Sequence, residues 1–348
     1  MKKSSGNLIQ AVIRAFEAYP ARVCFKSKRD GKYRDITYGE LKTLAMRISL
    51  QLTKRGFAPG SRVIILADNS PEWMAACIGS LLSGGVVIPV DTNVKTELLG
   101  RILNDSSASL IFTEDMDRAL GVEAMCGNRP AIVVMEKFEG GPGPLTPLDS
   151  LTGSAFTEEE FEALISRAEG IEPESPAFIF YTAKETGTPR GALFSHSRIL
   201  RSLTHVSEWL TLDEFDLGFT TLSWSNFPSL VTAFRYLLSG VGNALTGGVD
   251  TVFEDLQQTS PTVTMTSPFS LENIYRRIMD ELDQMPESRR KIFEWALALG
   301  RQYRSAESTA SKELRERYTR ADMVFFGRMR AILGGRLQRI YCAGAHLT

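Results

Sequence analysis

Residues 62–90 read RVIILADNSPEWMAACIGSLLSGGVVIPV, and this stretch decides the fold class. Its first residues, RVIILA, are mostly apolar, rich in branched side chains and too few for a helix, which predicts a buried strand. Ser70 and Pro71 are typical of a helix start, and Gly84-Gly85 is typical of a helix end. Val86–Val90 then predicts a second buried strand. A strand, a helix and a strand in succession indicate parallel strands joined by a helical crossover.

The same alternation continues on both sides of this stretch. Thr37 and Glu40 have the spacing of a capping box, and the apolar residues that follow repeat at helical spacing. Downstream we expect a helix near 96–106 and strands at 109–112 and 131–135. Strands that alternate with helices predict an α/β protein, in which helices wrap a parallel sheet.

The segment 139–157 is rich in glycine, proline and other small residues, with GGPGPLTP at its centre. No strand and helix flank it closely, so we interpret it as a surface loop and not as a phosphate site. A second α/β stretch begins near Ser207 and runs to the end of the chain. We find no internal repeat.

The composition is that of a packed protein of about two domains, because 348 residues with 43% apolar and 23% charged side chains can bury a sizeable core. Forty Lys and Arg against 41 Asp and Glu give a net charge of -1, so no global field attracts nucleic acid or an anionic membrane. Met1-Lys2-Lys3 has the charge of a signal peptide, but a polar segment follows it and not an apolar run. The apolar stretch 77–90 is shorter than the roughly 20 residues of a membrane-spanning helix. We therefore expect a cytoplasmic protein without a nucleic-acid partner.

The cysteines and histidines do not form a recognisable metal or redox pattern. The cysteines are far apart in the sequence, at Cys24, Cys77, Cys126 and Cys342. The histidines lack metal-site spacing and stand at His196, His205 and His346. We expect four buried free thiols and no metal site, and we assign no catalytic residue from these patterns. For His196 we favour a packing role over a catalytic one.

A polar loop, AKETGTPRG at 183–191, lies between a predicted buried strand at 177–182 and a predicted helix from Ser195 to Leu203. A strand, a glycine-containing loop and a helix can present backbone N–H groups and a cation to phosphates. The loop lacks the Gly-Lys-Ser/Thr ending of a Walker motif. On this pattern alone the phosphate-loop interpretation is weak.

A resemblance makes the interpretation specific. Residues 181–191 and Ser195-His196 are similar to the motif of adenylate-forming enzymes, Tyr-Thr-Ser-Gly-Thr-Thr-Gly-x-Pro-Lys-Gly followed by Ser/Thr-His. Other segments resemble the same family in the same order: DITYGEL at 35–41, NSPEW at 69–73 and LLSGGVVIPVD at 81–91. Three later segments resemble its long-chain fatty acyl branch: VTMTSP with ENIY in 263–275, FEWAL at 293–297 and LGGRL at 333–337. The chain is identified as a member of the acyl-CoA synthetase superfamily, closest to long-chain fatty acid-CoA ligases.

The resemblance implies both a fold and a reaction. The fold is the family's N-terminal region, two doubly wound lobes with substrates between them: 1–60 with 206–348, and 61–205. The reaction joins a fatty acid to ATP with Mg²⁺, and then transfers the acyl group to coenzyme A. The family's phosphate loop corresponds to Thr182, Ala183, Lys184, Glu185, Thr186, Gly187, Thr188 and Arg190.

This chain departs from the family's phosphate loop at three adjacent positions. Ala183-Lys184-Glu185 replaces Ser-Gly-Thr, which removes two hydroxyl donors and one conformationally free position. Glu185 adds a negative charge, much of which Lys184 can offset, and Arg190 replaces lysine with a different donor geometry. We therefore expect weak ATP binding.

Two further groups of residues follow from the resemblance. The adenine side corresponds to Gly344, Ala345 and His346. The acyl or thioester passage corresponds to Trp224, Asn226 and Phe227. An alternative for Trp224, an ordinary core residue beside the predicted helix 228–238, stays open.

Several family segments have no counterpart before Thr348: the adenine and magnesium step, the ribose-binding residues and the C-terminal lid domain with its catalytic lysine. We therefore expect the chain to be truncated relative to the family and inactive alone. It is then either a ligase region that works with a separate C-terminal half, or a non-catalytic pseudo-ligase that binds an acyl chain or a protein. A predicted edge strand at 337–341 indicates self-association or a partner.

A basic helix start, Arg289-Arg290-Lys291, raises a last question about partners. The helix that follows carries apolar residues on one face, at Ile292, Ala296, Leu299 and Tyr303. That face suits peripheral contact with a membrane from which fatty acid arrives. It equally suits packing on its own lobe with a solvated cationic end, and both interpretations stay open.

Overall fold

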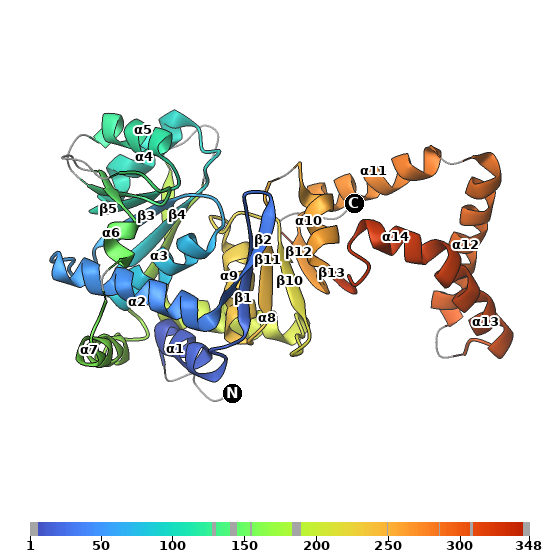
Figure 1. The fold of residues 1–348 in the computed structure, drawn as a ribbon, viewed down its shortest axis with the longest axis horizontal. Helices are drawn as coiled ribbons and strands as arrows, with labels where there is room; N and C mark the ends of the chain where they lie inside the picture. Colours follow the sequence, from blue (N-terminus) through green and yellow to red (C-terminus); the bar gives the residue numbers. More distant parts are fainter. Residues whose placement is uncertain are drawn as a thin grey trace. The chain divides into compact units, whose positions relative to one another are not determined.

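The computed structural model describes residues 6–126, 130–139, 145–153, 155–182, 189–248, 250–284, 286–306 and 309–343. The chain divides into two compact units, which we describe separately (Figure 1). The first unit runs to Phe215 and includes Leu222–Leu245. The second contains Asp216–Thr221 and the chain from Thr246 onward. The division into lobes 1–60 with 206–348 and 61–205 stays a prediction.

The first unit alternates strands and helices along most of its length. Its elements are α1 (Leu8–Ala18), β1 (Val23–Arg29), β2 (Lys32–Thr37), α2 (Tyr38–Lys54), β3 (Arg62–Leu66), α3 (Pro71–Leu82), β4 (Val86–Val90), α4 (Thr96–Ser106), β5 (Leu110–Thr113), α5 (Met116–Cys126), β6 (Ala131–Val134), β7 (Leu145–Pro147), α6 (Asp149–Thr152), α7 (Glu158–Glu169), β8 (Pro176–Thr182), β9 (Arg190–Ser195), α8 (His196–Trp209), α9 (Phe227–Leu238) and β11 (Gly242–Leu245).

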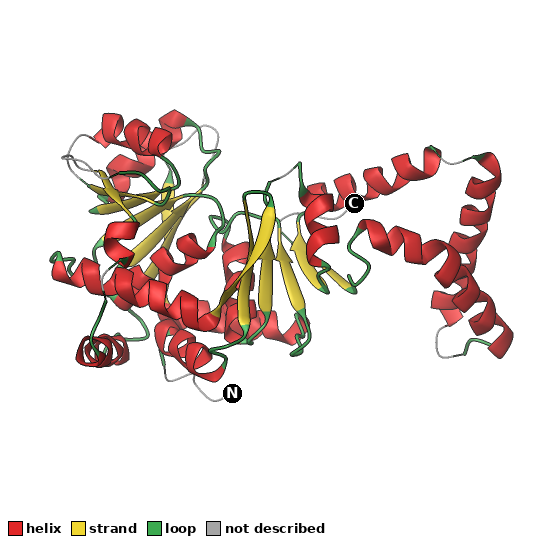
Figure 2. Ribbon diagram, in the orientation of Figure 1, coloured by secondary structure: helices red, strands yellow, loops and turns green. Residues whose placement is uncertain are grey.

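A seven-stranded sheet with helices on both faces forms most of the first unit (Figure 2). Its strand order is β7-β6-β5-β3-β4-β8-β9, and every neighbouring pair is parallel except β8 with β9. Val63 and Ile65 of β3 pack with α2 and α3, whereas Ile64 and Leu66 pack with α4 and α5. Alternate residues of a strand point to opposite faces, so each face has its own core. The α/β prediction is confirmed.

The predicted helix starts at Thr37 and Ser70 are both observed. Thr37 accepts from the backbone N–H of Glu40, and the Glu40 side chain accepts from that of Thr37, which completes the capping box. Ser70 caps α3, and Pro71 occupies its first turn. The apolar stretch 77–90 forms the end of α3 and β4 and is buried, apart from half-buried Gly84. Among the described residues, no helix combines the length and the hydropathy that a membrane span requires.

Two features of the first unit were not anticipated. The segment 139–157, predicted to be a surface loop, includes β7 and α6, because β7 pairs in parallel with β6. Near the N-terminus, β1 and β2 form an antiparallel hairpin, and β1 also pairs in parallel with β11. Its turn residues Asp30 and Gly31 have φ values of 51° and 74°, as the Asp-Gly hairpin turn requires.

The second unit contributes three neighbouring parallel strands and a series of helices. Its elements are β10 (Leu217–Thr220), α10 (Val252–Thr259), β12 (Val263–Thr266), α11 (Pro268–Asp283), α12 (Glu287–Ala306), α13 (Lys312–Ala321), the π-helical segment η1 (Asp322–Phe326), α14 (Gly327–Ile332) and β13 (Arg339–Cys342). The strand order is β13-β12-β10. Arg339 donates to both carboxylate oxygens of Asp216 at 2.6 Å, which ties β13 to the start of β10.

The prediction of four buried free thiols is half right. None of the four cysteines forms a disulfide, and Cys24 and Cys77 are buried. Cys126 is only half-buried at the end of α5, and Cys342 is exposed on β13, where half-buried and exposed side chains alternate. The residue type alone therefore does not predict burial for a cysteine at the end of a helix or on an edge strand.

Candidate phosphate and acyl site

The β8–β9 hairpin carries the predicted phosphate loop between its strands. Thr182 and Arg190 form its last described pair, and the Thr182 hydroxyl donates to the Arg190 carbonyl at 3.4 Å. Both side chains are exposed. The remaining predicted loop residues, Ala183, Lys184, Glu185, Thr186, Gly187 and Thr188, lie outside the described residues. The structure thus defines the two ends of the loop.

Close packing inside the hairpin explains why glycine follows Arg190. A Cβ atom on Gly191 would lie 2.7 Å from Ile179 Cγ2, closer than real Cβ atoms come, and 3.3 Å from the Tyr181 ring. The Tyr181 hydroxyl donates to Asp105 of α4 at 2.6 Å. Burial, and then this carboxylate acceptor, raise the pKa of Tyr181 well above its usual range. Tyr181 therefore remains a neutral donor that anchors β8 beside the loop.

The helix that leaves the hairpin, α8, begins with a capped and buried turn. Ser195 accepts from the backbone N–H of Arg198 at 3.3 Å, and His196 is only 1% exposed. Burial lowers the pKa of His196 to about 4, so its imidazole is neutral near pH 7. Its Nδ1 atom has no hydrogen-bond partner among the described residues. This environment agrees with the packing role that we favoured from the sequence.

The first residue of α9 lies against the same hairpin. The Phe227 ring stacks on Phe194 of β9 with centroids 4.5 Å apart, and it meets Phe180 of β8 edge-on at 5.3 Å. These contacts bring a predicted acyl-passage residue onto the two strands that carry the predicted phosphate loop. Aromatic rings in such offset and edge-on arrangements attract one another beyond simple burial.

The other two predicted passage residues differ from Phe227 in exposure. Trp224 is fully buried, with its ring 5.1 Å from Trp73 and 5.8 Å from Phe25, so its surroundings are those of a core residue. Asn226 is exposed at the start of α9 and makes no side-chain capping hydrogen bond. The passage role of all three residues stays a prediction.

Asn69 and Asp91, which the sequence analysis did not name as site residues, hold residues 222–225 in place. The Asn69 amide donates to the Leu222 carbonyl and accepts from the Trp224 backbone N–H, both at 2.8 Å. The Ser225 hydroxyl donates to the Asp91 carboxylate at 3.2 Å. Asn69 and Asp91 follow the carboxyl ends of β3 and β4, where open α/β sheets place their functional loops. That position was the signal that could have identified them.

The family assignment follows from comparison with known proteins. Residues 12–348 match the family model described as AMP-binding enzyme. The chain belongs to this family. It is 25% identical to the long-chain-fatty-acid–CoA ligase FadD15 of Mycobacterium bovis, over 94% of this chain and 54% of that protein. It is 24% identical to long chain acyl-CoA synthetase 2 of Arabidopsis thaliana, over 91% of this chain and 49% of that protein. It spans about half the length of these relatives.

Two solved structures share the fold. The inhibitor-bound N-terminal domain of FACL13 from Mycobacterium tuberculosis matches with a TM-score of 0.63 and 20% identity, over 81% of this chain and 66% of that one. A luciferase-like enzyme from the mealworm Zophobas morio matches with a TM-score of 0.66 and 18% identity, over 78% of this chain and 61% of that one. The expected N-terminal-domain fold is confirmed.

The predicted adenine-side residues lie beyond the part of the chain that the structure describes. Gly344, Ala345 and His346, on the predicted adenine side, lie outside the described residues, just after β13 of the second unit. In the part of the chain that the structure describes, no three His, Cys, Asp or Glu side chains are grouped as a metal site requires.

Proposed function

We propose that this chain is the N-terminal, substrate-binding region of an ATP-dependent long-chain fatty acyl-CoA ligase. In that reaction a fatty carboxylate attacks the α-phosphate of ATP, pyrophosphate leaves, and coenzyme A then takes the acyl group as a thioester. The observation that carries the proposal is the match to AMP-binding enzymes over nearly the whole chain, together with relatives named as long-chain ligases.

The described ends of the loop suit a phosphate ligand. Arg190 supplies an exposed guanidinium, and the exposed Thr182 hydroxyl would exchange its long 3.4 Å bond to the Arg190 carbonyl for one to a phosphate oxygen. A cation and oriented donors beside the pyrophosphate stabilise the charge that develops as it leaves. Magnesium would accompany the nucleotide, and we assign none of its ligands to this chain.

The acyl side is proposed to lie at Phe227 and the strands beneath it. Phe180, Phe194 and Phe227 form an apolar group next to the loop ends, where the carboxylate of a fatty acid must meet the α-phosphate. Each methylene buried in an apolar site contributes about 0.8 kcal/mol. A chain of sixteen carbons would therefore be distinguished from a short acid by its length alone.

The test uses two non-hydrolysable acyl-adenylate analogues, one carrying palmitoyl and one carrying acetyl, titrated by calorimetry. If the site buries only four more methylenes of the longer chain, palmitoyl gains about 3 kcal/mol, roughly 200-fold in affinity. Phe227→Ser should weaken the palmitoyl analogue and leave the acetyl analogue unchanged, which also shows that the variant is folded. Phe161→Ser, which removes a half-buried aromatic ring elsewhere in the first unit, is the matched control.

Two results would count against the proposal in different ways. Equal affinity for the two analogues contradicts the long-chain substrate class, and failure to bind either one contradicts the ligase site itself. Binding of free palmitate without any binding of magnesium ATP would instead support a non-catalytic acyl-binding protein. The replacement of Ser-Gly-Thr by Ala183-Lys184-Glu185 favours that second candidate.

A further inference from the structure

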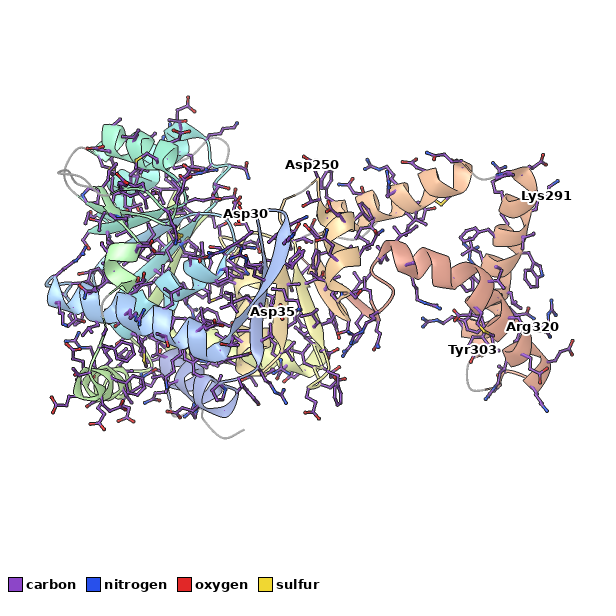
Figure 3. All side chains as sticks on the ribbon, viewed as in Figure 1. Asp30, Asp35, Asp250, Lys291, Tyr303 and Arg320 are labelled. Atoms are coloured by element: carbon purple, nitrogen blue, oxygen red, sulfur yellow. The ribbon has the colours of Figure 1, made fainter. Side chains whose placement is uncertain are left out.

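The carboxyl ends of β10, β12 and β13 lie side by side in the second unit (Figure 1), and the described side chains are drawn as sticks in Figure 3. β13 is the outer strand, and its side chains alternate between half-buried and exposed. Ile340 and Cys342 point to the exposed face, because residues two apart in a strand share a face. β13 therefore presents an aliphatic side chain and a thiol next to each other on one accessible surface.

A buried hydroxyl lies on the neighbouring strand beside this thiol. Thr266 is the last residue of β12 and pairs with Cys342, so their Cα atoms are about 4.8 Å apart and their side chains share a face. Thr266 is only 1% exposed, and its hydroxyl has no hydrogen-bond partner among the described residues. Burial of a hydroxyl without a partner costs stability, so its presence calls for an explanation. A ligand oxygen bound beside Cys342 would supply the missing partner.

The two buried cysteines lack the properties of a reactive thiol. Burial raises the pKa of Cys24 and of Cys77 far above the usual range. Such thiols are inert, because the thiolate is the nucleophile. Cys126 is half-buried at the end of α5, whereas Cys342 is exposed at the end of a strand. An electrophile in solution therefore has the most open access to Cys342.

We propose that Cys342 is an acylation site, which takes a fatty acyl group from a coenzyme A thioester. The Cys342 thiolate attacks the carbonyl carbon, a new carbon–sulfur bond forms, and the bond to the sulfur of coenzyme A breaks. Coenzyme A leaves as a thiolate and takes up the proton that Cys342 has lost, so the exchange needs no other reactant. The Thr266 hydroxyl donates to the carbonyl oxygen, on which negative charge develops during the attack.

The exposed face of β13 fits this class of donor. Ile340 is 40% exposed and offers apolar surface beside the thiol, where the first methylenes of an acyl chain would lie. A carbonyl oxygen is the acceptor that the Thr266 hydroxyl lacks among the described residues. The class of donor rests on the proposed function, because fatty acyl-CoA is the product of a long-chain ligase. The acylation itself needs no ATP, so the two proposals can fail separately.

The first experiment incubates the full chain with palmitoyl-CoA in the absence of ATP and maps the modified residue by mass spectrometry. We expect palmitoyl on Cys342, and neutral hydroxylamine should remove it because it cleaves thioesters. Cys342→Ser should abolish this modification, and Cys126→Ser should leave it unchanged. In urea, where the fold is lost, Cys342 and Cys126 should react without preference.

The substitution Thr266→Val separates a role in acylation from a role in folding. Loss of one hydrogen bond to the carbonyl oxygen should slow acylation about tenfold. Valine has a similar shape without the unpaired hydroxyl, so the thermal stability should stay equal or rise. Thr113→Val is the matched control, because Thr113 is also buried and its hydroxyl also lacks a partner among the described residues. It should change stability in the same direction and leave the acylation rate unchanged.

A comparison of palmitoyl-CoA with acetyl-CoA tests the apolar contact. Ile340→Ser should slow acylation by palmitoyl-CoA about fourfold, because burial of about one methylene is lost, and it should leave the rate with acetyl-CoA unchanged. Leu120→Ser on α5 is the control, because Leu120 is 50% exposed against 40% for Ile340. An equal loss of rate with both donors would contradict the contact between Ile340 and the acyl chain.

Three outcomes would overturn the acylation site. They are no palmitoylation of the folded chain, modification of Cys126 as fast as that of Cys342, and acylation that Thr266→Val leaves unchanged. Failure to bind magnesium ATP contradicts only the proposed ligase function. A Cys342 that palmitoyl-CoA leaves unmodified contradicts only the acylation site.

Discussion

Asn69 and Ser229 share one acceptor, and their combined removal should destabilise the first unit more than the two single changes predict. The Leu222 carbonyl accepts from the Asn69 amide and from the Ser229 hydroxyl, both at 2.8 Å. Asn69 also accepts from the Trp224 backbone N–H. Asn69→Ala therefore removes two hydrogen bonds, at about 1 kcal/mol each, and leaves the N–H of Trp224 unsatisfied. We expect a loss of about 2–3 kcal/mol for Asn69→Ala and about 1 kcal/mol for Ser229→Ala.

In the double variant the Leu222 carbonyl loses both donors, so its desolvation appears as an extra loss of about 1 kcal/mol beyond the sum. Urea unfolding followed by the fluorescence of buried Trp73 and Trp224 reports on this unit. Thr204→Ala removes an exposed hydroxyl that bonds only within α8, and it should change stability by less than about 0.5 kcal/mol. Additive single and double effects would refute the shared-acceptor reasoning.

Two further predictions concern the hairpin and the helix after it. His196 has a folded pKa of about 4 against 6.5 when unfolded, so its burial stabilises the protein fully above pH 6.5, and this contribution of up to about 3 kcal/mol is lost as the pH falls toward 4. In His196→Gln the free energy of unfolding should change less between pH 6.5 and 4 than in the natural sequence. If it falls as steeply in the variant, other groups cause the acid destabilisation. Gly191→Ala should cost about 1–3 kcal/mol in thermal unfolding because its Cβ meets Ile179, whereas Gly100→Ala, with open space around its Cβ, should stabilise by about 0.5–1 kcal/mol. If both substitutions changed the stability in the same direction, the close packing around Gly191 would be contradicted.

Local sequence signals identified the elements that depend on neighbours in the chain. The apolar run at 62–66 and the caps at Thr37 and Ser70 act within a few residues, and all three are observed as predicted. The β1–β2 hairpin was missed although Asp30-Gly31 is a hairpin turn signal, because the flanking residues are too polar to suggest a buried strand. β7 was missed because a three-residue strand is defined by its partner β6 and not by its own pattern.

The candidate site shows where sequence reasoning ends. The two interpretations of Trp224 could not be separated, because its surroundings come from Phe25 and Trp73, far along the chain. The amphipathic pattern of α12 was correct, but a pattern does not say what a face contacts, and its partners are α13 and the π-helical segment η1. Phe227 was placed by resemblance, and its contact with the hairpin depends on the tertiary fold.

Calorimetric titration with magnesium ATP tests most directly the claim that residues 182–190 form a nucleotide-binding loop whose altered residues weaken phosphate binding. The natural sequence is compared with a triple variant that carries Ala183→Ser, Lys184→Gly and Glu185→Thr. These changes restore two hydroxyl donors and remove one charge of each sign. Two hydrogen bonds of about 1 kcal/mol each and the lost repulsion of Glu185 compete with the lost attraction of Lys184. We predict weak binding by the natural sequence and about tenfold tighter binding by the variant, which corresponds to about 1.4 kcal/mol. Binding by the natural sequence as tight as that of the variant, or tighter, would contradict the account and make Lys184 a working phosphate clamp.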